Sequence, residues 1–446
     1  MEFIFSVDLH KMFCSKGMNE TSQGGAVFVF IHRHYIKYVL FNLILVFLEE
    51  TLMKRFYVSA ILICLFIFIP SKPAGADEPI RIGLTLGLTG KYAKMSDMQL
   101  KGFKLWQEDV NRRGGILGRE IELTIYDDKS NPRIATSIYK QLILNSRVDL
   151  LFAPYSSEIT EAILPITEKY GYPLLLSGAS ADSLWQKGYK HVFGIFTPAS
   201  KYVVGFLELL VMNDFENISI VYADDTFSKG LAEGTNKWAE RFGLKVILFE
   251  RFKKGKRNLD NIAEKLKASR PQVVIVCGHF NEAVDMRLSL KRVGWYPEAF
   301  YASVGPVIDG YYERLGPDAE YTFSSSQWEP RLNIPGSREF YNRFLKKYGV
   351  RPAYQAADAY AAGQILESAI KKAGGLDRDR LGKILSAMDT MSIIGRYGVD
   401  RTGMQTKHFP LIIQWQNGRK EIVWPEQFRT ANPIFKKKPM FKSENN

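Results

Sequence analysis

Residues 273–277 read Val-Val-Ile-Val-Cys, an unbroken apolar run between two stretches of helical periodicity at 259–269 and 281–293. A short apolar run of this kind is typical of a strand that is buried on both faces of a parallel sheet. Residues 218–222 and 299–303 repeat the strand pattern on either side. Apolar strands that alternate with helices predict an α/β fold, with helices covering both faces of the sheet.

The first half of the chain shows the same alternation, which predicts a second α/β unit. The strands expected there are residues 80–86, 120–126, 148–153, 173–176 and 191–196. The helices expected between them are residues 97–113, 132–145 and 157–170, the first closed by Gly114 and Gly115. The other elements expected in the second half are a strand at 245–249 and helices at 201–213 and 227–242. The sequence therefore predicts two Rossmann-like lobes with parallel central sheets.

The last part of the chain is expected to complete both lobes. It begins with three predicted helices, at 337–348, 354–374 and 378–388, and ends in a predicted hairpin, 407–415 and 420–424, around an Asn-Gly turn. Helices without strands of their own must cover existing sheets, so the chain is expected to cross between the lobes more than once. The predicted division is a first lobe of 77–198 with 327–402, a second lobe of 199–326 with 403–427, and a disordered tail of 428–446.

The composition is that of a globular chain with no sign of a metal site. Of 446 residues, 46% are hydrophobic and 24% are charged, which excludes disorder and coiled coil as the main architecture. The net charge of +13 is spread along the chain, and we interpret the longest basic run, 436–438, as solvated, so no nucleic-acid partner is expected. The three cysteines, Cys14, Cys64 and Cys277, have no metal-ligand or redox spacing, and Cys277 is expected to be a packed, inert thiol.

A secretory signal peptide is predicted at residues 53–76. Residues 53–55 (Met-Lys-Arg) precede a 15-residue apolar run, and residues 74–76 (Ala-Gly-Ala) provide the small-residue pattern before a cleavage site. The run is short for a membrane span, although an uncleaved anchor is the alternative. A lipoprotein is disfavoured, since no small residue precedes Cys64. We expect residues 1–52 not to be translated; a genuine extension that anchors the chain is the other possibility.

Two serine-bearing loops follow neighbouring predicted strands. Ser156 and Ser157 follow one strand, and Ser157 is expected to be the N-cap of the next helix. Gly178, Ala179 and Ser180 follow the next strand. Because the carboxyl ends of parallel strands meet at one edge of a sheet, the two loops together favour one anion site. Simple helix capping and a simple turn are the alternatives.

Aromatic residues are expected to close the site from the second lobe. Phe227 follows one predicted strand end, and His279 with Phe280 follows another. In the first lobe, Tyr92 lies in the predicted loop 87–93. The spacing of the glycines in and before this loop is not that of a dinucleotide-binding site. A histidine in such a place is more often structural than a metal ligand, and no metal or cofactor is expected.

Catalytic signatures are missing from the sequence. It contains no G-x-S-x-G, H-E-x-x-H or G-x-x-x-x-G-K-[ST] motif. We interpret the acidic pairs at 127–128 and 224–225 as loop and cap residues rather than metal ligands. An enzyme with a Rossmann-like fold is therefore disfavoured.

Three sequence stretches carry a resemblance to a known family: 82–90, 110–119 (Val-Asn-Arg-Arg-Gly-Gly-Ile-Leu-Gly-Arg) and 126–132 (Tyr-Asp-Asp-Lys-Ser-Asn-Pro). The two serine loops, at the expected distance from each other, and residues 357–360 (Ala-Asp-Ala-Tyr) match too. On these motifs the chain, from about residue 79 to 422, resembles the type I periplasmic solute-binding proteins of branched-chain amino-acid ABC transporters, the Leu/Ile/Val-binding protein-like family.

The resemblance implies two lobes joined by three crossovers that close on a ligand. It implies that Ser157 and Ser180, with the backbone of Gly178 and Ala179, hold a ligand carboxylate, and that the aromatic residues of the second lobe contact the ligand. Where amino-acid binders of the family place an acidic residue for the ammonium group, this sequence has Val307. Because burying an unpaired ammonium is costly, we expect a carboxylate without an amine, or an amide.

The predicted function is therefore that of a periplasmic, non-enzymatic binding protein. It would capture a small carboxylate-bearing solute, either a branched-chain amino acid or a related aliphatic or aromatic acid or amide, by hinge closure. It would deliver this solute, as a monomer, to an ABC permease in the inner membrane. A ligand-sensing domain that feeds a receptor or regulator is the alternative, because recognition of the solute would use the same chemistry.

Overall fold

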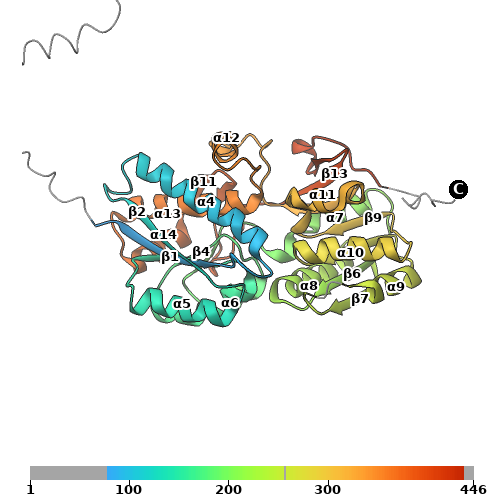
Figure 1. Cartoon of the computed structure of the whole chain (residues 1–446), viewed down its shortest axis with the longest axis horizontal. Coiled ribbons are helices and arrows are strands. Elements are labelled where there is room, and N and C mark those ends of the chain that lie inside the picture. The colour runs from blue at the N-terminus through green and yellow to red at the C-terminus, as the bar shows by residue number, and fades with distance from the viewer. Residues whose placement is uncertain (1–77, 256–257, 436–446) are drawn as a thin grey trace, which may run out of the picture. The chain divides into compact units, whose positions relative to one another are not determined.

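The computed structural model describes residues 78–255 and 258–435 (Figure 1). The predicted signal peptide, the segment 1–52 and the basic run at 436–438 lie outside the described residues. Within the described ranges, no helix combines the length and apolar character needed to cross a membrane.

The first lobe is built on a five-stranded parallel sheet with the order β2-β1-β3-β4-β5. Its strands are β1 (Ile80–Leu86), β2 (Ile121–Asp127), β3 (Leu150–Phe152), β4 (Leu174–Leu176) and β5 (Val192–Gly194). Its helices are α4 (Ala93–Arg112), α5 (Pro132–Leu144), α6 (Ser157–Lys169), α13 (Tyr354–Ala373) and α14 (Arg378–Ala387). Helices α5 and α6 lie on one side of the sheet, and α4 packs against α13 on the other (Figure 1).

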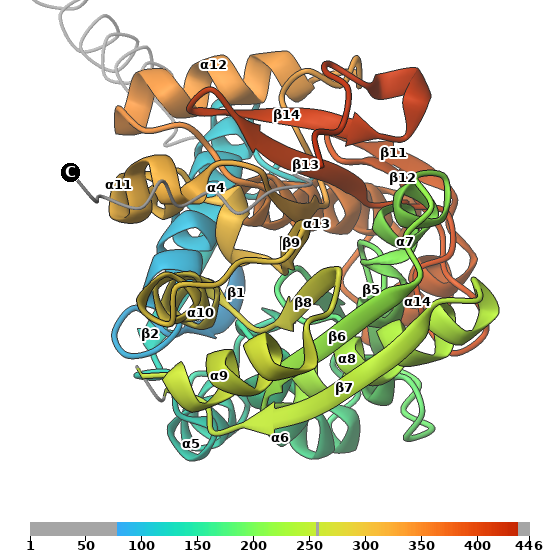
Figure 2. The same ribbon diagram turned by 90° about the vertical axis from the view of Figure 1, so that its right-hand side faces the viewer.

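The second lobe is built on a seven-stranded sheet with the order β14-β13-β10-β9-β8-β6-β7 (Figure 2). Its strands are β6 (Asn217–Ala223), β7 (Lys245–Phe252), β8 (Val273–Cys277), β9 (Ala299–Ala302), β10 (Thr322–Ser326), β13 (Leu411–Gln416) and β14 (Arg419–Trp424). Strands β6 to β10 are parallel, whereas β13 and β14 are antiparallel additions. The order β7-β6-β8-β9-β10 repeats that of the first sheet, as the repeated alternation in the sequence predicts.

The remaining helices of the second lobe are α7 (Val204–Val211), α8 (Thr226–Arg241), α9 (Asp260–Ser269), α10 (Phe280–Arg292) and α11 (Gly310–Leu315). Two further elements contact the first lobe: α12 (Ser337–Tyr348) packs on α4, and the small sheet β11 (Thr390–Ser392) with β12 (Gly395–Tyr397) lies against α13. Short 3-10 turns lie at Asp182–Leu184, Ala199–Lys201, Gly305–Val307, Gly316–Ala319 and Glu426–Phe428.

Local sequence signals account for several element boundaries. The Asn131 side chain caps α5 by accepting hydrogen bonds from the backbone N–H groups of Arg133 and Ile134, as expected of an N-cap residue. Asn417 and Gly418 adopt φ angles of 52° and 72° between β13 and β14. Two positive φ angles suit a tight hairpin, which confirms the predicted Asn-Gly turn.

Strand β10 was not expected from the sequence. Its residues Thr-Phe-Ser-Ser-Ser are polar in composition, yet all five are buried between β9 and β13. Hydrogen bonds explain how serines are tolerated there: Ser325 Oγ donates to Tyr202 O at 2.6 Å, and Ser326 Oγ donates to Trp328 O at 2.7 Å. A search for apolar runs misses this strand because three of its five residues are serines. The Ser324 hydroxyl has no hydrogen-bond partner among the described residues.

Two other expectations need correction. The predicted helix at 201–213 is a 3-10 turn followed by the shorter α7. The tail was expected to be disordered from residue 428, but residues up to 435 pack on the second lobe. Phe435 stacks on Phe323 with ring centroids 5.2 Å apart, and the Gln414 side chain hydrogen bonds to both the N–H and the C=O of Ile434. Ring stacking and hydrogen bonds from the Gln414 side chain to the backbone therefore hold this segment in place.

The three connections between the two sheets meet at His408. His408 Nδ1 lies 2.9 Å from Thr197 Oγ1, and Nε2 lies 2.9 Å from the carbonyl oxygen of Gln327. Since a carbonyl only accepts, Nε2 carries the proton. Burial lowers the pKa of His408 to about 4, so the ring is neutral at pH 7. One side chain thus hydrogen bonds across all three crossovers.

Candidate functional site

A small cavity lies where loops of the first lobe face helix starts of the second. Its lining residues are Tyr155, Ser156, Ser157, Ser177, Gly178, Ser180, Phe196, Tyr202, Phe227, His279, Val304 and Tyr354. The cavity volume is about 10 Å³, room for roughly one water molecule. A larger solute therefore requires the lobes or the lining side chains to move apart.

The two predicted serine loops meet at this cavity. They follow β3 and β4, which are adjacent and parallel. Ser157 Oγ accepts hydrogen bonds from the backbone N–H groups of Ser180 and Ala181, each at 3.1 Å. Ser180 Oγ lies 3.0 Å from the Tyr202 hydroxyl. Ser157 thus ties the two loops together, and because a hydroxyl donates once as well as accepting, its own proton remains to donate.

Ser156, not Ser157, is the N-cap residue of α6, which corrects the sequence prediction. The Ser156 hydroxyl is buried against the cavity; it lies near Tyr92 but hydrogen bonds to none of the residues that the structure describes. A buried hydroxyl without a partner is costly unless a ligand or water satisfies it. Two serine hydroxyls and the N-terminal end of a 13-residue helix therefore lie at the same cavity, an arrangement that favours an anion.

Gly178 is required by close packing of the second loop. A Cβ at this position would lie 2.7 Å from Gln99 Nε2 and 2.7 Å from Tyr155 Cδ2. Gln99 is held in place by the hydrogen bond that its Nε2 donates to Ser177 O at 2.8 Å. The loop backbone can therefore approach the cavity only with glycine at residue 178.

Three of the predicted site residues do not line the cavity. Ala179 lies between Gly178 and Ser180 but is turned away from it. Tyr92 stands behind the lining, with its ring centroid 5.1 Å from that of His279. Phe280 is the first residue of α10, one position on from the N-cap His279, and its ring is covered by Lys94 instead. The step of about 100° between neighbouring helical positions separates the two side chains.

Ring-bearing residues make up half of the cavity lining. Phe227 and His279 were predicted from the sequence, whereas Tyr155, Phe196, Tyr202 and Tyr354 were not. Tyr155 of the first lobe faces His279 of the second, with ring centroids 6.2 Å apart, and within the second lobe Tyr202 and Phe227 are 5.7 Å apart. The missed residues follow strands or open a helix, like those predicted, but only the tertiary structure selects them from the 22 tyrosines and 29 phenylalanines of the chain.

A buried ion pair supports the second-lobe side of the cavity, and the sequence analysis did not single it out. Lys254 Nζ lies 2.7 Å from Asp225 Oδ2, with the two side chains 8% and 3% exposed. Asp225 also caps α8 by accepting from Ser228 N, which confirms its predicted role as a cap residue. Burial raises the pKa of Asp225, but His279 and Lys254 more than offset this and lower it to about 2.

The same lysine determines how His279 presents its ring. Burial, together with the Lys254 ammonium, lowers the pKa of His279 to about 3, so the ring is neutral at pH 7. Lys254 Nζ lies 2.9 Å from His279 Nδ1, and an ammonium can only donate. Nδ1 is therefore the acceptor and Nε2 carries the proton. His279, which lines the cavity, thus carries its proton on Nε2.

Direct contacts join the lobes around the cavity. Thr226 Oγ1 donates to Glu161 Oε2 at 2.8 Å, from α8 to α6. The Lys254 ammonium lies 4.7 Å from the centroid of the Tyr92 ring. These contacts hold the two lobes against each other in the structure.

Among the described residues no carboxylate lines the cavity, and Val307 does not line it either. Val304 lines the cavity instead, whereas Val307 faces a separate hollow beside α11. The 3-10 turn Gly305–Val307 shifts the register of this loop. Two second-lobe carboxylates close to His279 are already engaged: Asp225 is paired with Lys254, and Glu282 accepts a hydrogen bond from His279 N at 3.0 Å.

The acidic strand ends are engaged in local hydrogen bonds. Asp128 accepts from Thr85 Oγ1 at 2.7 Å, and Asp127 accepts from Thr89 Oγ1 at 2.7 Å. Across the part of the chain that the structure describes, no three His, Cys, Asp or Glu side chains gather closely enough to hold a metal ion. Cys277 is buried in β8, which raises its pKa far above the ordinary thiol value.

The repeated parallel sheets, the three crossovers and the cavity between the lobes define a type I periplasmic binding protein. Solved structures share this fold. The branched-chain amino acid transporter substrate-binding protein LivJ of Streptococcus pneumoniae, in complex with isoleucine, gives a TM-score of 0.71 at 21% identity, covering 77% of this chain and 98% of that one. A solute-binding protein of R. palustris in complex with benzoate gives 0.69 at 18% identity, covering 77% and 95%.

Residues 79–420 match the family described as periplasmic binding protein, and the chain belongs to that family. A relative in Pseudomonas aeruginosa, a leucine-, isoleucine-, valine-, threonine- and alanine-binding protein, is 24% identical over 344 residues, covering 76% of this chain and 91% of the relative. Leu/Ile/Val-binding protein homolog 7 of Brucella melitensis is 24% identical, covering 79% and 93%. The family resemblance predicted from the sequence is thus confirmed.

Proposed function

We propose that the protein is the extracytoplasmic binding component of an ABC importer and captures a small carboxylate-bearing solute. The observation that carries this is the buried Ser156 hydroxyl, which has no hydrogen bond of ordinary geometry to the described residues, beside Ser157 at the N-terminal end of α6. The two hydroxyls and the helix dipole suit one carboxylate group. The protein would act as a monomer and pass the solute to the permease.

Hinge closure would couple binding to recognition by the permease. The two serine hydroxyls that would bind the carboxylate belong to the first lobe, whereas Phe227 and His279 belong to the second. Only the closed form brings both sets of side chains into contact with one solute, so the solute would favour that form. The permease would then read the closed shape.

The lining favours a planar solute without an amine. Six rings surround the cavity, and no carboxylate lines it to receive an ammonium group. The known relatives span both classes, since one bound structure holds isoleucine and another holds benzoate. We infer that an aromatic carboxylate binds more tightly than leucine, with the His279 Nε2–H donor and the ring faces on its far side.

A thermal-shift screen followed by calorimetry tests this proposal. The panel contains benzoate and its hydroxylated derivatives, branched aliphatic acids, leucine, valine and short amides. A ligand at 100 times its dissociation constant adds about 2.7 kcal/mol of stability. We expect one of the carboxylates to bind, with an affinity that Ser157→Ala lowers at least about tenfold. The control Ser386→Ala, at an exposed position of α14, should leave this affinity unchanged. Preferential binding of leucine would contradict the inferred solute class, and a hit unaffected by Ser157→Ala would contradict the site.

We also propose that the exported chain begins at Asp77 and that the lobes have the predicted bounds, 77–198 with 327–402 and 199–326 with 403–427. The placement of the two sheets and the His408 hydrogen bonds supports this division. Intact-mass measurement of the protein from its native host tests the start, because any mass that includes residues before 77 contradicts it.

A further inference from the structure

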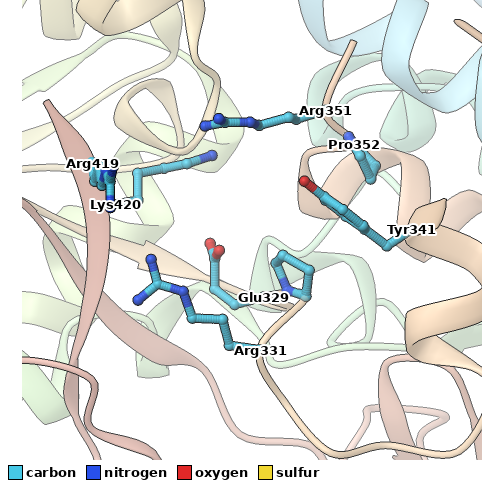
Figure 3. A pocket seen from close by; sticks show the side chains of 8 residues that line it. Glu329, Arg331, Tyr341, Arg351, Pro352, Arg419 and Lys420 are labelled. Atoms are coloured by element: carbon cyan, nitrogen blue, oxygen red, sulfur yellow. The ribbon is translucent and has the colours of Figure 1, made fainter. Parts of the chain in front are cut away.

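A second cavity, of about 290 Å³, lies between β14 and the α12–α13 connection and shares no residue with the solute cavity (Figure 3). Its polar lining side chains are Glu329, Arg331, Tyr341, Arg351, Arg419 and Lys420. We propose that this cavity binds a small doubly charged anion, such as a dicarboxylate, sulfate or phosphate. The proposal does not depend on the identity of the transported solute.

Two of the four cationic residues already have partners. Arg331 pairs with Glu421 on β14. Lys420 Nζ lies 3.1 Å from Asp309 Oδ1 and donates to Val307 O at 2.5 Å. These two residues form part of the wall, and their charges are largely neutralised by the protein itself.

Arg351 and Arg419 form no ion pair within the described part of the chain. Arg419 is close enough to Glu421 to lower the pKa of that carboxyl group, but the closer partner of Glu421 is Arg331. In Figure 3 the ends of Arg351, Lys420 and Tyr341 converge on the middle of the pocket. Guanidinium groups bind carboxylate, sulfate and phosphate oxygens in pairs, so two uncommitted arginines suit an anion with two charges.

Glu329 limits how tightly this anion can bind. The residue is 9% exposed, and its carboxylate points into the pocket (Figure 3). Burial raises its pKa, and Lys420, Ser326 and Arg331 partly offset this effect. An ionised Glu329 repels a bound anion, so removing its charge is expected to strengthen binding.

The position of the cavity links it to the hinge. Glu329 and Arg331 follow Gln327, whose carbonyl accepts from His408 in the crossover cluster. Arg419 belongs to the second sheet, whereas Tyr341 is on α12, which packs on α4 of the first lobe. An anion held by both sides would therefore favour the relative position of the lobes seen in this structure.

Calorimetric titration of the full chain with sodium sulfate, inorganic phosphate and succinate at low ionic strength tests the proposal. We expect one site per chain, and weaker binding of acetate than of succinate. Arg351→Gln and Arg419→Gln should each weaken binding about tenfold, whereas Glu329→Gln should strengthen it several-fold. Arg351→Lys should cause a smaller loss of affinity than Arg351→Gln, because lysine keeps the positive charge but lacks the paired N–H donors of the guanidinium group. The affinities for succinate and phosphate show whether the site prefers a dicarboxylate or an inorganic dianion.

Arg133→Gln is the matched control, since Arg133 is an exposed arginine on α5 with no ion pair in the described residues. Equal effects of Arg133→Gln and Arg351→Gln would overturn the proposal, because they would show only screening of the net charge. Loss of binding in Ser157→Ala with full binding in Arg351→Gln would also overturn it, by placing the anion in the solute cavity. Since Arg351 and Arg419 are exposed, unfolding midpoints without anion should not change. Neither overturning result would touch the solute proposal, which uses other residues.

Discussion

Replacement of Lys254 by methionine is expected to destabilise the second lobe through Asp225. The side chains of Lys254 and Asp225 are 8% and 3% exposed and lie 2.7 Å apart. Folded Asp225 has a pKa of about 2 against an ordinary value of 3.8, which corresponds to about 2 to 3 kcal/mol of stability. That contribution is complete above pH 4 and is lost as the pH falls through 2. Leaving the carboxylate buried without its partner costs about 3 to 5 kcal/mol at pH 7.

The pH dependence of the Lys254→Met variant is the decisive part of this prediction. In this variant His279 still faces Asp225, and the loss of Lys254 removes a charge that lowers the pKa of His279. Proton uptake by the Asp225–His279 pair as the pH falls therefore relieves the penalty. In urea unfolding followed by circular dichroism, the deficit relative to wild type should shrink between pH 7 and pH 5. The double variant Lys254→Met with Asp225→Asn should recover at least about 2 kcal/mol of the single-variant loss.

The neighbouring Lys253 provides the control for this experiment. Lys253 is exposed, and Lys253→Met should change the free energy of unfolding by less than about 0.5 kcal/mol. The reasoning is refuted if Lys254→Met costs no more than Lys253→Met, or if its deficit is the same at pH 5 and pH 7.

Three further predictions follow from the buried groups. The pKa of His408 is about 4 in the folded protein and about 6.5 in the unfolded chain, so the folded state loses up to about 3 kcal/mol of stability as the pH falls from 6.5 to 4. His408→Phe should flatten this part of the plot of stability against pH. An unchanged plot would count against the crossover cluster. Ser157→Ala removes the acceptor of two backbone N–H groups and should lower stability by about 1 to 3 kcal/mol in urea unfolding even without solute; no loss would mean that the loops are not tied there. Cys277 should react with a thiol reagent only after unfolding, and rapid labelling of the native protein would contradict its burial in β8.

The regular parts of the fold could be predicted from the sequence because their patterns are local. The apolar run at Val273–Cys277 and the amphipathic helix at Ser337–Tyr348 have the bounds that their periodicity indicates. The strand Thr322–Ser326 could not be found in this way, since its burial depends on partners such as Tyr202 O that are distant in the sequence. The same holds for residues up to 435, which are ordered by contacts with β13 and with Phe323.

The candidate site was predictable where strand ends bring residues together. Ser157 and Ser180 follow adjacent parallel strands, and this relation could be predicted from the chain order. Lys254 was missed because it follows an edge strand and reaches the cavity only through His279. Val304 lines the cavity and Val307 does not, and which residue of such a loop faces a cavity cannot be read from the sequence without a template.

A crystal structure of the protein with the best carboxylate from the ligand screen tests the central claim most directly. The account predicts the carboxylate within hydrogen-bond distance of the Ser156 and Ser157 hydroxyls, at the N-terminal end of α6, with the rest of the solute between the rings of the two lobes. A solute bound elsewhere, or one whose carboxylate faces the second lobe while Ser156 stays unpaired, would contradict it.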